Sequence, residues 1–192
     1  MSHGFALFET PIGTCAIAWG KQGILGVQLP EQSDLAMRTL MQRQHPEATE
    51  LLAPPAIQSA IDAIVALLTG KSSDLSAIPL DMHGVPEFHQ RVYAVARTIP
   101  PGCTLSYGEI AARLGEPAWP AARDVGQALG QNPFPIIVPC HRVVAANGKL
   151  GGFSARGGAR TKRRLLAIEI ASTSSDGHAP AAFTIPLFAD RQ

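Results

Sequence analysis

Three short apolar segments near the N-terminus most limit what this chain can fold into. They cover residues 5–8, 15–19 and 24–29, and residues 11–13 and 20–23, which contain Pro and Gly, separate them. Short apolar or alternating runs between such turns are typical of antiparallel strands. We therefore expect a small antiparallel sheet at the start of the chain.

Two segments with helical spacing follow these strands. Residues 33–44 and 55–68 are predicted to be helices, and the second carries its apolar side chains on one stripe. Pro55 begins this second segment, and Gly70 comes just after its end. We expect both helices to pack on the sheet. Residues 72–84 form a polar connection that contains Pro and Gly, and we place a domain boundary near residue 84.

The second part of the chain is predicted to be mostly helical. Residues 85–99 form a helix that ends at Pro100, and a capping box of Ser106 and Glu109 starts a short helix over residues 107–114. After a turn, Pro120 begins a helix over residues 121–130. Two short helices joined by a turn resemble a helix-turn-helix, although such pairs also serve only for packing. A glycine-rich loop then leads to a last helix over residues 159–170.

Composition is consistent with this outline. The chain has 192 residues, of which 46% are hydrophobic and 16% charged, and this excludes a largely disordered protein. No apolar run approaches the ~20 residues of a membrane span, and we expect a cytoplasmic protein. The predicted fold class is α+β, with an N-terminal sheet-and-helix domain over 1–84, a helical, winged-helix-like domain over 85–170, and an extension over 171–192.

The net charge of +1 hides a strong asymmetry along the chain. Residues 1–90 carry a net −5, whereas residues 91–170 carry +7, and no acid occurs from 125 to 168. A basic half of this kind suits a surface that meets a polyanion such as DNA. A solvated basic helix without a partner has the same composition, so charge alone leaves both interpretations open.

Cys140 is the candidate nucleophile among three cysteines. Cysteine attacks as a thiolate, which needs a nearby base because its ordinary pKa is near 8.5. Cys140 lies beside His141 in a loop with two prolines, whereas Cys15 and Cys103 fit buried or unreactive positions. Neighbouring side chains in an extended segment point apart, so a turn or a bridging water is required for contact.

Glu169 is a candidate partner of His141. It follows Leu165 by four residues and Leu166 by three, so it shares their inward stripe on the last helix, with Lys162 and Arg163 expected outside. A carboxylate on an apolar stripe needs a partner, and His141 would complete a Cys–His–Glu relay. A plain surface glutamate at a helix end is the alternative.

The helix over residues 121–130 has small side chains and one long basic residue. Ala121, Ala122 and Gly126 are too short to reach base edges in the major groove, but they would allow close approach to the minor groove. Arg123 could occupy the space that an extruded base leaves. This pattern favours lesion recognition by base flipping without a sequence preference.

Four segments carry a specific resemblance to a known family. In chain order they are SYGEIAARLG, AARDVGQALGQNP, IIVPCHRVVAANGKLGGFS and TKRRLLAIE. They resemble the O6-alkylguanine-DNA alkyltransferases, also called methylated-DNA–protein-cysteine methyltransferases, across residues 85–169. Residues 1–84 fit the variable N-terminal, ribonuclease-H-like domain of that family in general shape.

The resemblance implies a role for each matching residue. Cys140 would accept the alkyl group. His141, supported by Glu169, would deprotonate Cys140 through a water, and Asn132 would hold the active-site turn. Tyr107 would press on the target phosphate and supply a proton to the leaving base. Arg123, Ala121, Ala122, Gly126 and Arg142 would meet duplex DNA, and Tyr107, Leu129, Pro135, Val143, Phe153 and Ser154 would form the pocket.

The implied reaction consumes the protein. Transfer from O6-alkylguanine, with O4-alkylthymine as a further substrate, leaves a thioether on Cys140 that water does not open, so each monomer would react once. We expect no cofactor and no zinc, because Cys15 is the one cysteine in the N-terminal part. The turn over 116–120 and the loop over 153–158 are longer than in well-known relatives, which leaves the alkyl preference open.

Two other classes of protein stay open on the residues alone. A non-catalytic lesion sensor could share the fold, but Cys140 argues against it because such a sensor has no cysteine at the acceptor position. A cysteine hydrolase could use Cys140 and His141 on acyl substrates, but it would need neither Arg123 nor a basic half.

Overall fold

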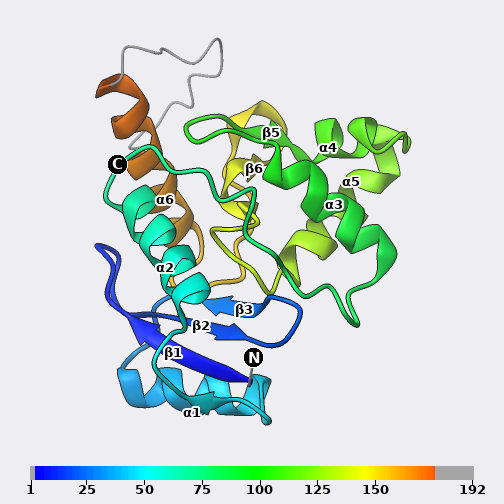
Figure 1. Ribbon diagram of the computed structural model, residues 1–192. Coiled ribbons are helices and arrows are strands. Elements are labelled where there is room, and N and C mark those ends of the chain that lie inside the picture. The colour runs from blue at the N-terminus through cyan, green and yellow to red at the C-terminus, as the bar shows by residue number, and fades with distance from the viewer. Residues whose placement is uncertain (1–2, 176–192) are drawn as a thin grey trace.

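The predicted N-terminal sheet is present in the computed structural model, which describes residues 3–175 (Figure 1). Strands β1 (Gly4–Phe8), β2 (Cys15–Trp19) and β3 (Ile24–Gln28) form an antiparallel meander. Gly4 of β1 pairs with Trp19 of β2, and Ala16 of β2 pairs with Gln28 of β3. The three short apolar segments are therefore strands, and the Pro- and Gly-containing segments between them are turns, as predicted.

A fourth strand was not predicted. β4 (Thr49–Glu50) pairs in parallel with β1, which gives the order β3-β2-β1-β4. Both of its residues are exposed, and a strand of two residues has no apolar pattern to recognise. Its position depends on the return of the chain from the preceding helix.

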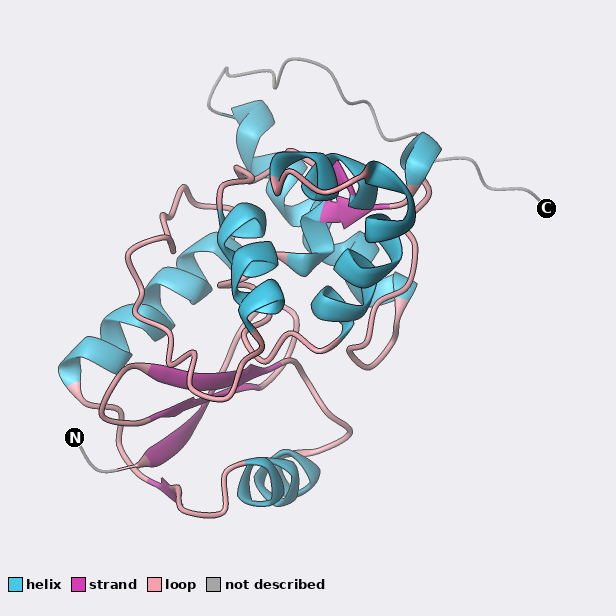
Figure 2. Cartoon of the chain, turned by 90° about the vertical axis from the view of Figure 1, so that its right-hand side faces the viewer, coloured by secondary structure: helices cyan, strands magenta, loops and turns pink. Residues whose placement is uncertain are grey.

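Helices cover both faces of this sheet. Helix α1 (Asp34–Gln44), capped by the side chain of Ser33, packs Met37 and Met41 against one face of β2. Helix α2 (Pro55–Leu68) contributes its apolar stripe to the cluster on the opposite face. Figure 2 shows α1 on one side of the strands and the other helices on the opposite side. Because both faces are covered, all five residues of β2 are buried.

Among the described residues, the second part contains four α-helices. They are α3 (Glu87–Arg97), α4 (Tyr107–Arg113), α5 (Ala118–Gly130) and α6 (Ala159–Ser175). The capping box at the start of α4 is confirmed, with Ser106 and Glu109 bonded to each other's backbone N–H. Helix α5 begins three residues before the predicted start, since its first turn accommodates Pro120. Helix α6 continues beyond residue 170, where the apolar pattern ends but polar residues still allow a helix.

A two-stranded parallel sheet, also not predicted, connects distant segments of the second part. β5 (Leu105–Ser106) pairs with β6 (Val143–Val144), with Leu105 opposite Val143. β5 leads directly into Tyr107, and β6 follows a first 3-10 turn, η1 (Cys140–Arg142). A second 3-10 turn, η2 (Ala146–Gly148), comes after β6. The pairing therefore sets the start of α4 beside the segment that carries Cys140.

The two parts pack into one continuous core. A single apolar cluster includes Ile17 of β2, Ile61 of α2, Val125 of α5 and Leu165 of α6. The edge of β3 also donates from Val27 N–H to the carbonyl of Pro133, at 2.8 Å. The division near residue 84 stays a prediction. Most of the predicted extension over 171–192 lies outside the described residues.

None of the helices within residues 3–175 combines the length and apolar character needed to cross a membrane.

Candidate active site

The turn after α5 is held by Asn132. Its amide Nδ2 donates to the carbonyl of Val138 at 3.0 Å, and its Oδ1 accepts from Phe134 N–H at 2.9 Å. The turn also contains Ile136 with a φ of 76°, a conformation that a β-branched residue rarely adopts. Because Ile136 is buried, packing helps to hold this backbone. The turn is therefore fixed before the chain reaches Cys140.

Cys140 begins the 3-10 turn η1 and is 7% exposed. Burial raises the pKa of its thiol, while a hydrogen bond from Asn132 and the positive charge of Lys162 act in the opposite direction. The thiol therefore stays protonated until a base takes its proton. The 3-10 turn also changes the direction of successive side chains, so His141 follows Cys140 without the alternation of a strand.

His141 and Glu169 form a buried pair. The Nε2 of His141 lies 2.8 Å from Oε1 of Glu169, and the two residues are 1% and 2% exposed. Burial is the main cause that lowers the pKa of His141, helped by the charges of Arg142 and Lys162, and it outweighs the opposite effect of Glu169. His141 is therefore neutral at neutral pH.

Glu169 is ionised because cationic and hydrogen-bonding groups surround it. Burial opposes its charge, but His141 and Arg142 outweigh burial and lower the pKa of Glu169 to about 2. Arg142 donates from Nε and Nη2 to the carboxylate, and Gly102 N–H donates to Oε2 at 3.2 Å. A carboxylate accepts only, so Nε2 of His141 carries the proton and Nδ1 carries the lone pair. Nδ1 is buried and has no hydrogen-bond partner in the structure.

Lys162 is the unexpected member of the site. It is fully buried on α6, where its Nζ donates to the carbonyl of Val143 at 2.6 Å and lies 5.9 Å from the centre of the Tyr107 ring. Burial lowers its pKa to about 8. At neutral pH the ammonium is charged and favours the thiolate form of Cys140.

Tyr107 lies at the start of α4, where two glycines allow close packing. The would-be Cβ of Gly151, a residue with a φ of +68°, would lie 3.1 Å from the hydroxyl of Tyr107. The would-be Cβ of Gly126 on α5 would lie 3.7 Å from the ring. Burial raises the pKa of Tyr107, so its hydroxyl is protonated and can donate.

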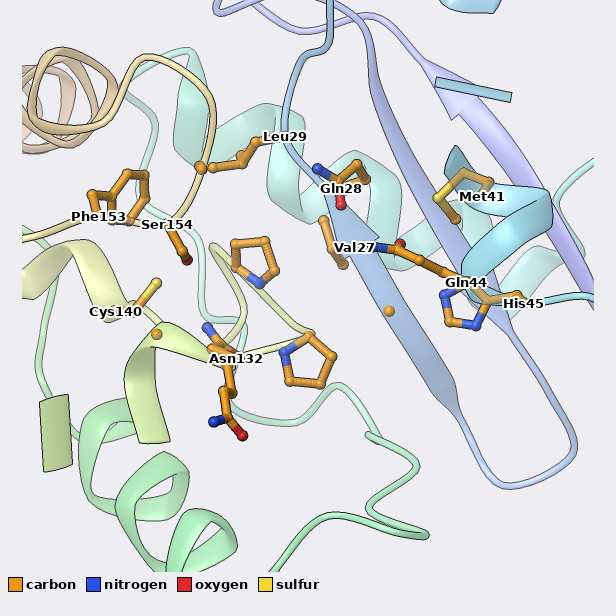
Figure 3. Close-up of a pocket in the computed structure, with 16 residues that line it drawn as sticks. Val27, Gln28, Leu29, Met41, Gln44, His45, Asn132, Cys140, Phe153 and Ser154 are labelled. Atoms are coloured by element: carbon orange, nitrogen blue, oxygen red, sulfur yellow. The ribbon is translucent and has the colours of Figure 1, made fainter. Parts of the chain in front are cut away.

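A cavity of about 510 Å³ opens beside Cys140, a size typical of small-molecule sites. Pro135, Phe153 and Ser154 line it from the second part of the chain, and β3 and the end of α1 line it from the first. Figure 3 shows Cys140, Phe153 and Ser154 around one part of the cavity and Gln44 and His45 around another. Residues from both parts of the chain therefore surround the space beside Cys140.

Comparison with known proteins identifies the family. Residues 5–82 match the ribonuclease-like domain of 6-O-methylguanine DNA methyltransferase, and residues 87–171 match its DNA-binding domain. A methylated-DNA–protein-cysteine methyltransferase of Mycobacterium bovis is 43% identical over 90% of this chain and 95% of its own length. The chain belongs to the 6-O-methylguanine DNA methyltransferase family.

Two further comparisons support the family and the fold of this methyltransferase. A methylated-DNA–protein-cysteine methyltransferase of Methanothermobacter thermautotrophicus is 35% identical over 83% of this chain and 81% of its own length. The crystal structure of Mycobacterium tuberculosis OGT in complex with DNA matches with a TM-score of 0.72 and 38% identity, covering 88% of this chain and 94% of that one. The predicted family and α+β fold are confirmed.

Several residues predicted for the methyltransferase site lie together in the structure. His141 and Glu169 are paired, Asn132 bonds within its turn, and Pro135, Phe153 and Ser154 line the cavity with Cys140. Arg123 is exposed on α5, and Ala122 and Gly126 on the same helix are half-buried. The catalytic and DNA-binding roles of these residues remain predictions.

Three expectations need correction. Arg142 was expected to meet DNA, but it is 6% exposed and bonds to Glu169 and the carbonyl of Ile99. Ala121, expected at the DNA surface, lies in the apolar core with 7% exposure. Lys162 was expected on the outer face of α6, but it points inward because it precedes Glu169 by seven residues, which is two helical turns. That spacing was a signal in the sequence that could have identified it.

The structure also changes the expected pocket. Leu129 and Val143 are buried in the core and do not line the cavity, nor does Tyr107 among the described residues. The N–H of Val143 donates to the carbonyl of Cys140. Conversely, the cavity wall from β3 and α1, with Val27, Gln28, Gln44 and His45, was not predicted. These residues are far from Cys140 in sequence, and no local pattern connects them to it.

Within residues 3–175, no group of three or more His, Cys, Asp and Glu side chains is arranged to hold a metal ion.

Proposed function

We propose that this protein repairs O6-alkylguanine in duplex DNA by moving the alkyl group onto its own Cys140, once per molecule. The observation that carries the proposal is the buried His141–Glu169 pair next to Cys140, with Nδ1 of His141 left as the unpaired base. The relatives that match over most of the chain are named methylated-DNA–protein-cysteine methyltransferases. O4-alkylthymine is a further substrate of the same chemistry.

The transfer begins with the thiol proton. Nδ1 of neutral His141 takes it through a bridging water, and Glu169 stabilises the imidazolium that forms. Lys162 stabilises the thiolate by its charge. Glu169 acts through His141 and is therefore a positioning residue. Asn132 has the same kind of role, because it holds the turn that carries Cys140.

The thiolate then attacks the alkyl carbon. A C–S bond forms, the bond between that carbon and O6 breaks, and its electron pair goes to the departing guanine. The protonated hydroxyl of Tyr107 supplies a proton to the base, and the proton that His141 took from the thiol returns through water to Tyr107. The net change exchanges the thiol hydrogen for the alkyl group. The product thioether is stable to water, so the alkyl group stays on Cys140.

Recognition of the lesion uses α5. Arg123 is exposed on this helix, where it can fill the space of an extruded base, and the small residues Ala122 and Gly126 permit close approach to the backbone. The basic second half of the chain supplies attraction to phosphates without a sequence preference. All of these contacts come from one copy of the chain. We therefore propose that the protein acts on DNA as a monomer, in the cytosol.

Intact-protein mass spectrometry tests the proposal. The protein is mixed with duplex DNA that contains O6-methylguanine, and we expect one added mass of about 14 Da, located on Cys140 by peptide mapping. Cys140→Ser should show no adduct and no repair. Cys103→Ser is the matched control, because Cys103 is not among the residues of the site, and it should react like the wild type.

Other outcomes would contradict the proposal. Binding to the lesion without a change in mass would indicate a sensor, and repeated cleavage of an ester without an adduct would indicate a hydrolase. Repair by Cys140→Ser, or more than one methyl group removed per molecule, would rule out stoichiometric transfer.

A further inference from the structure

The cavity beside Cys140 extends well beyond the sulfur, into the space between the two parts of the chain. We call the far end the distal chamber; it is lined by Val27, Gln28, Met41, Gln44 and His45. Val27 and Gln28 belong to β3, and Met41 and Gln44 belong to α1. In Figure 3 these side chains lie across the cavity from Cys140. The first part of the chain therefore builds a wall of the active-site cavity.

The wall is held to the active-site turn by close backbone contact. Val27 N–H donates to the carbonyl of Pro133 at 2.8 Å. The would-be Cβ of Gly26 would lie 2.9 Å from Nε2 of His45 and 3.4 Å from the same carbonyl of Pro133. Glycine at this position thus allows β3, His45 and the turn to meet, and the distal chamber keeps a fixed position relative to Cys140.

The cavity is polar but carries no formal charge. Its polar side chains are those of Gln28, Gln44, His45, Gln131, Asn132 and Ser154, and none of its described lining residues is Asp, Glu, Lys or Arg. Burial lowers the pKa of His45, so its ring is neutral at neutral pH. Such a wall can pair with hydroxyl, ether or carbonyl groups, but it cannot compensate a carboxylate.

The chemistry of transfer directs the remainder of a long substituent to one side. In an in-line displacement, the sulfur, the attacked carbon and O6 are roughly collinear, so the rest of the alkyl chain projects sideways from that line. Pro135, Phe153 and Ser154, which we assigned to the substrate pocket, line the cavity, whereas Tyr107 and Val143 are not among its described lining residues. The distal chamber lies across the cavity from Cys140 (Figure 3), where the outer end of a long substituent can reach it.

We propose that the distal chamber receives the outer end of long, uncharged O6-alkyl substituents and selects against anionic ones. Gln44 and His45 pair with a terminal hydroxyl or carbonyl group, and Gln28 lines the path from Cys140. This inference rests on the proposed alkyl transfer and names the class of lesion that the same site accepts.

The test uses duplexes of one sequence that carry O6-methylguanine, O6-hydroxybutylguanine or O6-carboxypropylguanine. Single-turnover rates are measured from the mass adduct on Cys140. The two long chains are similar in length and differ in charge. We expect the wild-type protein to transfer the hydroxybutyl group at least about tenfold faster than the carboxypropyl group, because the cavity wall removes part of the water around the carboxylate and offers no counter-charge. Equal rates would contradict selection by the uncharged wall.

A bulky residue should close the distal chamber. For Gln44→Trp, we expect the ratio of hydroxybutyl to methyl transfer rates to fall at least about tenfold, in the range that steric exclusion from a pocket produces. Gln42→Trp is the matched control, since Gln42 is exposed on the same helix and is not among the cavity-lining residues, and its ratio should equal that of the wild type. An unchanged ratio for Gln44→Trp would show that the hydroxybutyl substituent does not occupy the distal chamber.

A cation should reverse the selection. Gln44→Arg is expected to raise carboxypropyl transfer relative to hydroxybutyl transfer by about tenfold, because the guanidinium pairs with the carboxylate. Misfolding cannot produce such a gain. If Gln44→Arg showed no such gain, the proposed position of the outer end of the substituent would be wrong. Methyl transfer by the wild type tests the proposed function separately. If no methyl group is transferred, alkyl transfer itself is wrong. If methyl transfer occurs but the ratios of the transfer rates do not change as expected, only the role of the distal chamber is wrong.

Discussion

The ammonium of Lys162 lies 2.6 Å from the carbonyl oxygen of Val143, three residues beyond Cys140 in the sequence. This contact fixes a buried positive charge in the segment that carries the nucleophile. The charge cannot be screened by solvent, because Lys162 is fully buried. It connects α6 to the reactivity of Cys140 without direct contact with the substrate.

Lys162→Met should therefore raise the pKa of the Cys140 thiol. The measurement is the rate of Cys140 alkylation by iodoacetamide as a function of pH, followed by peptide mass. We expect the variant to react more slowly than the wild type below about pH 8, and the difference to shrink above about pH 8, where Lys162 loses its own proton. Arg163→Met is the control, because Arg163 is exposed on the same helix. Identical rates below about pH 8 in all three proteins would show that the charge does not act on the sulfur.

Glu169→Gln should impair both transfer and stability. The amide keeps the shape of the side chain but removes the charge that stabilises protonated His141, so we expect transfer to slow by on the order of 10²-fold. It also leaves Arg142 buried without its counter-charge, which should cost about 3 kcal/mol in the free energy of unfolding. Single-turnover kinetics and urea unfolding measure the two effects.

Glu87→Gln serves as a control for Glu169→Gln, since Glu87 is exposed at the start of α3. It should change neither quantity. A Glu169→Gln protein that unfolds earlier in urea but transfers at the wild-type rate would assign Glu169 a structural role alone.

Acid should remove the stabilisation that ionised Glu169 provides. The pKa of Glu169 is lowered in the folded protein to about 2, so its contribution is complete above the ordinary pKa of a glutamate and is lost as pH falls toward about 2. The shift corresponds to on the order of 3 kcal/mol. Urea unfolding at about pH 5 and about pH 3 should show a larger loss for the wild type than for Glu169→Gln. Equal losses would indicate that Glu169 is not the responsible group.

Arg123→Ala should separate base extrusion from chemistry. Without the long side chain, the gap left by the extruded base is not filled, and we expect repair of O6-methylguanine in duplex DNA to slow by about tenfold or more. Transfer from free O6-benzylguanine needs no extrusion and should change little. Asp124→Ala, at the next exposed position on α5, is the comparison. Equal losses on both substrates would reject the role of Arg123 in base flipping.

Local patterns in the sequence predicted the elements well. Turn residues separate the strands, Pro55 and Gly70 delimit α2, and Ser106 with Glu109 starts α4, because these residues act on backbone within a few positions. The resemblance of the segment around Cys140 also indicated the paired His141 and Glu169. Each of these features depends on a motif that is continuous in the chain or repeats at a helical period.

Other features depend on which segments meet in the folded protein. Lys162 and Arg142 read as surface cations from composition, yet both are buried because Val143, Glu169 and Ile99 provide acceptors from other elements. The same holds for the cavity wall, where Gln44 and His45 line the cavity opposite Cys140 and β3 contacts Pro133. The free energy of burying a charge or enclosing a cavity depends on partners distant in sequence, and a pattern within one segment does not contain them.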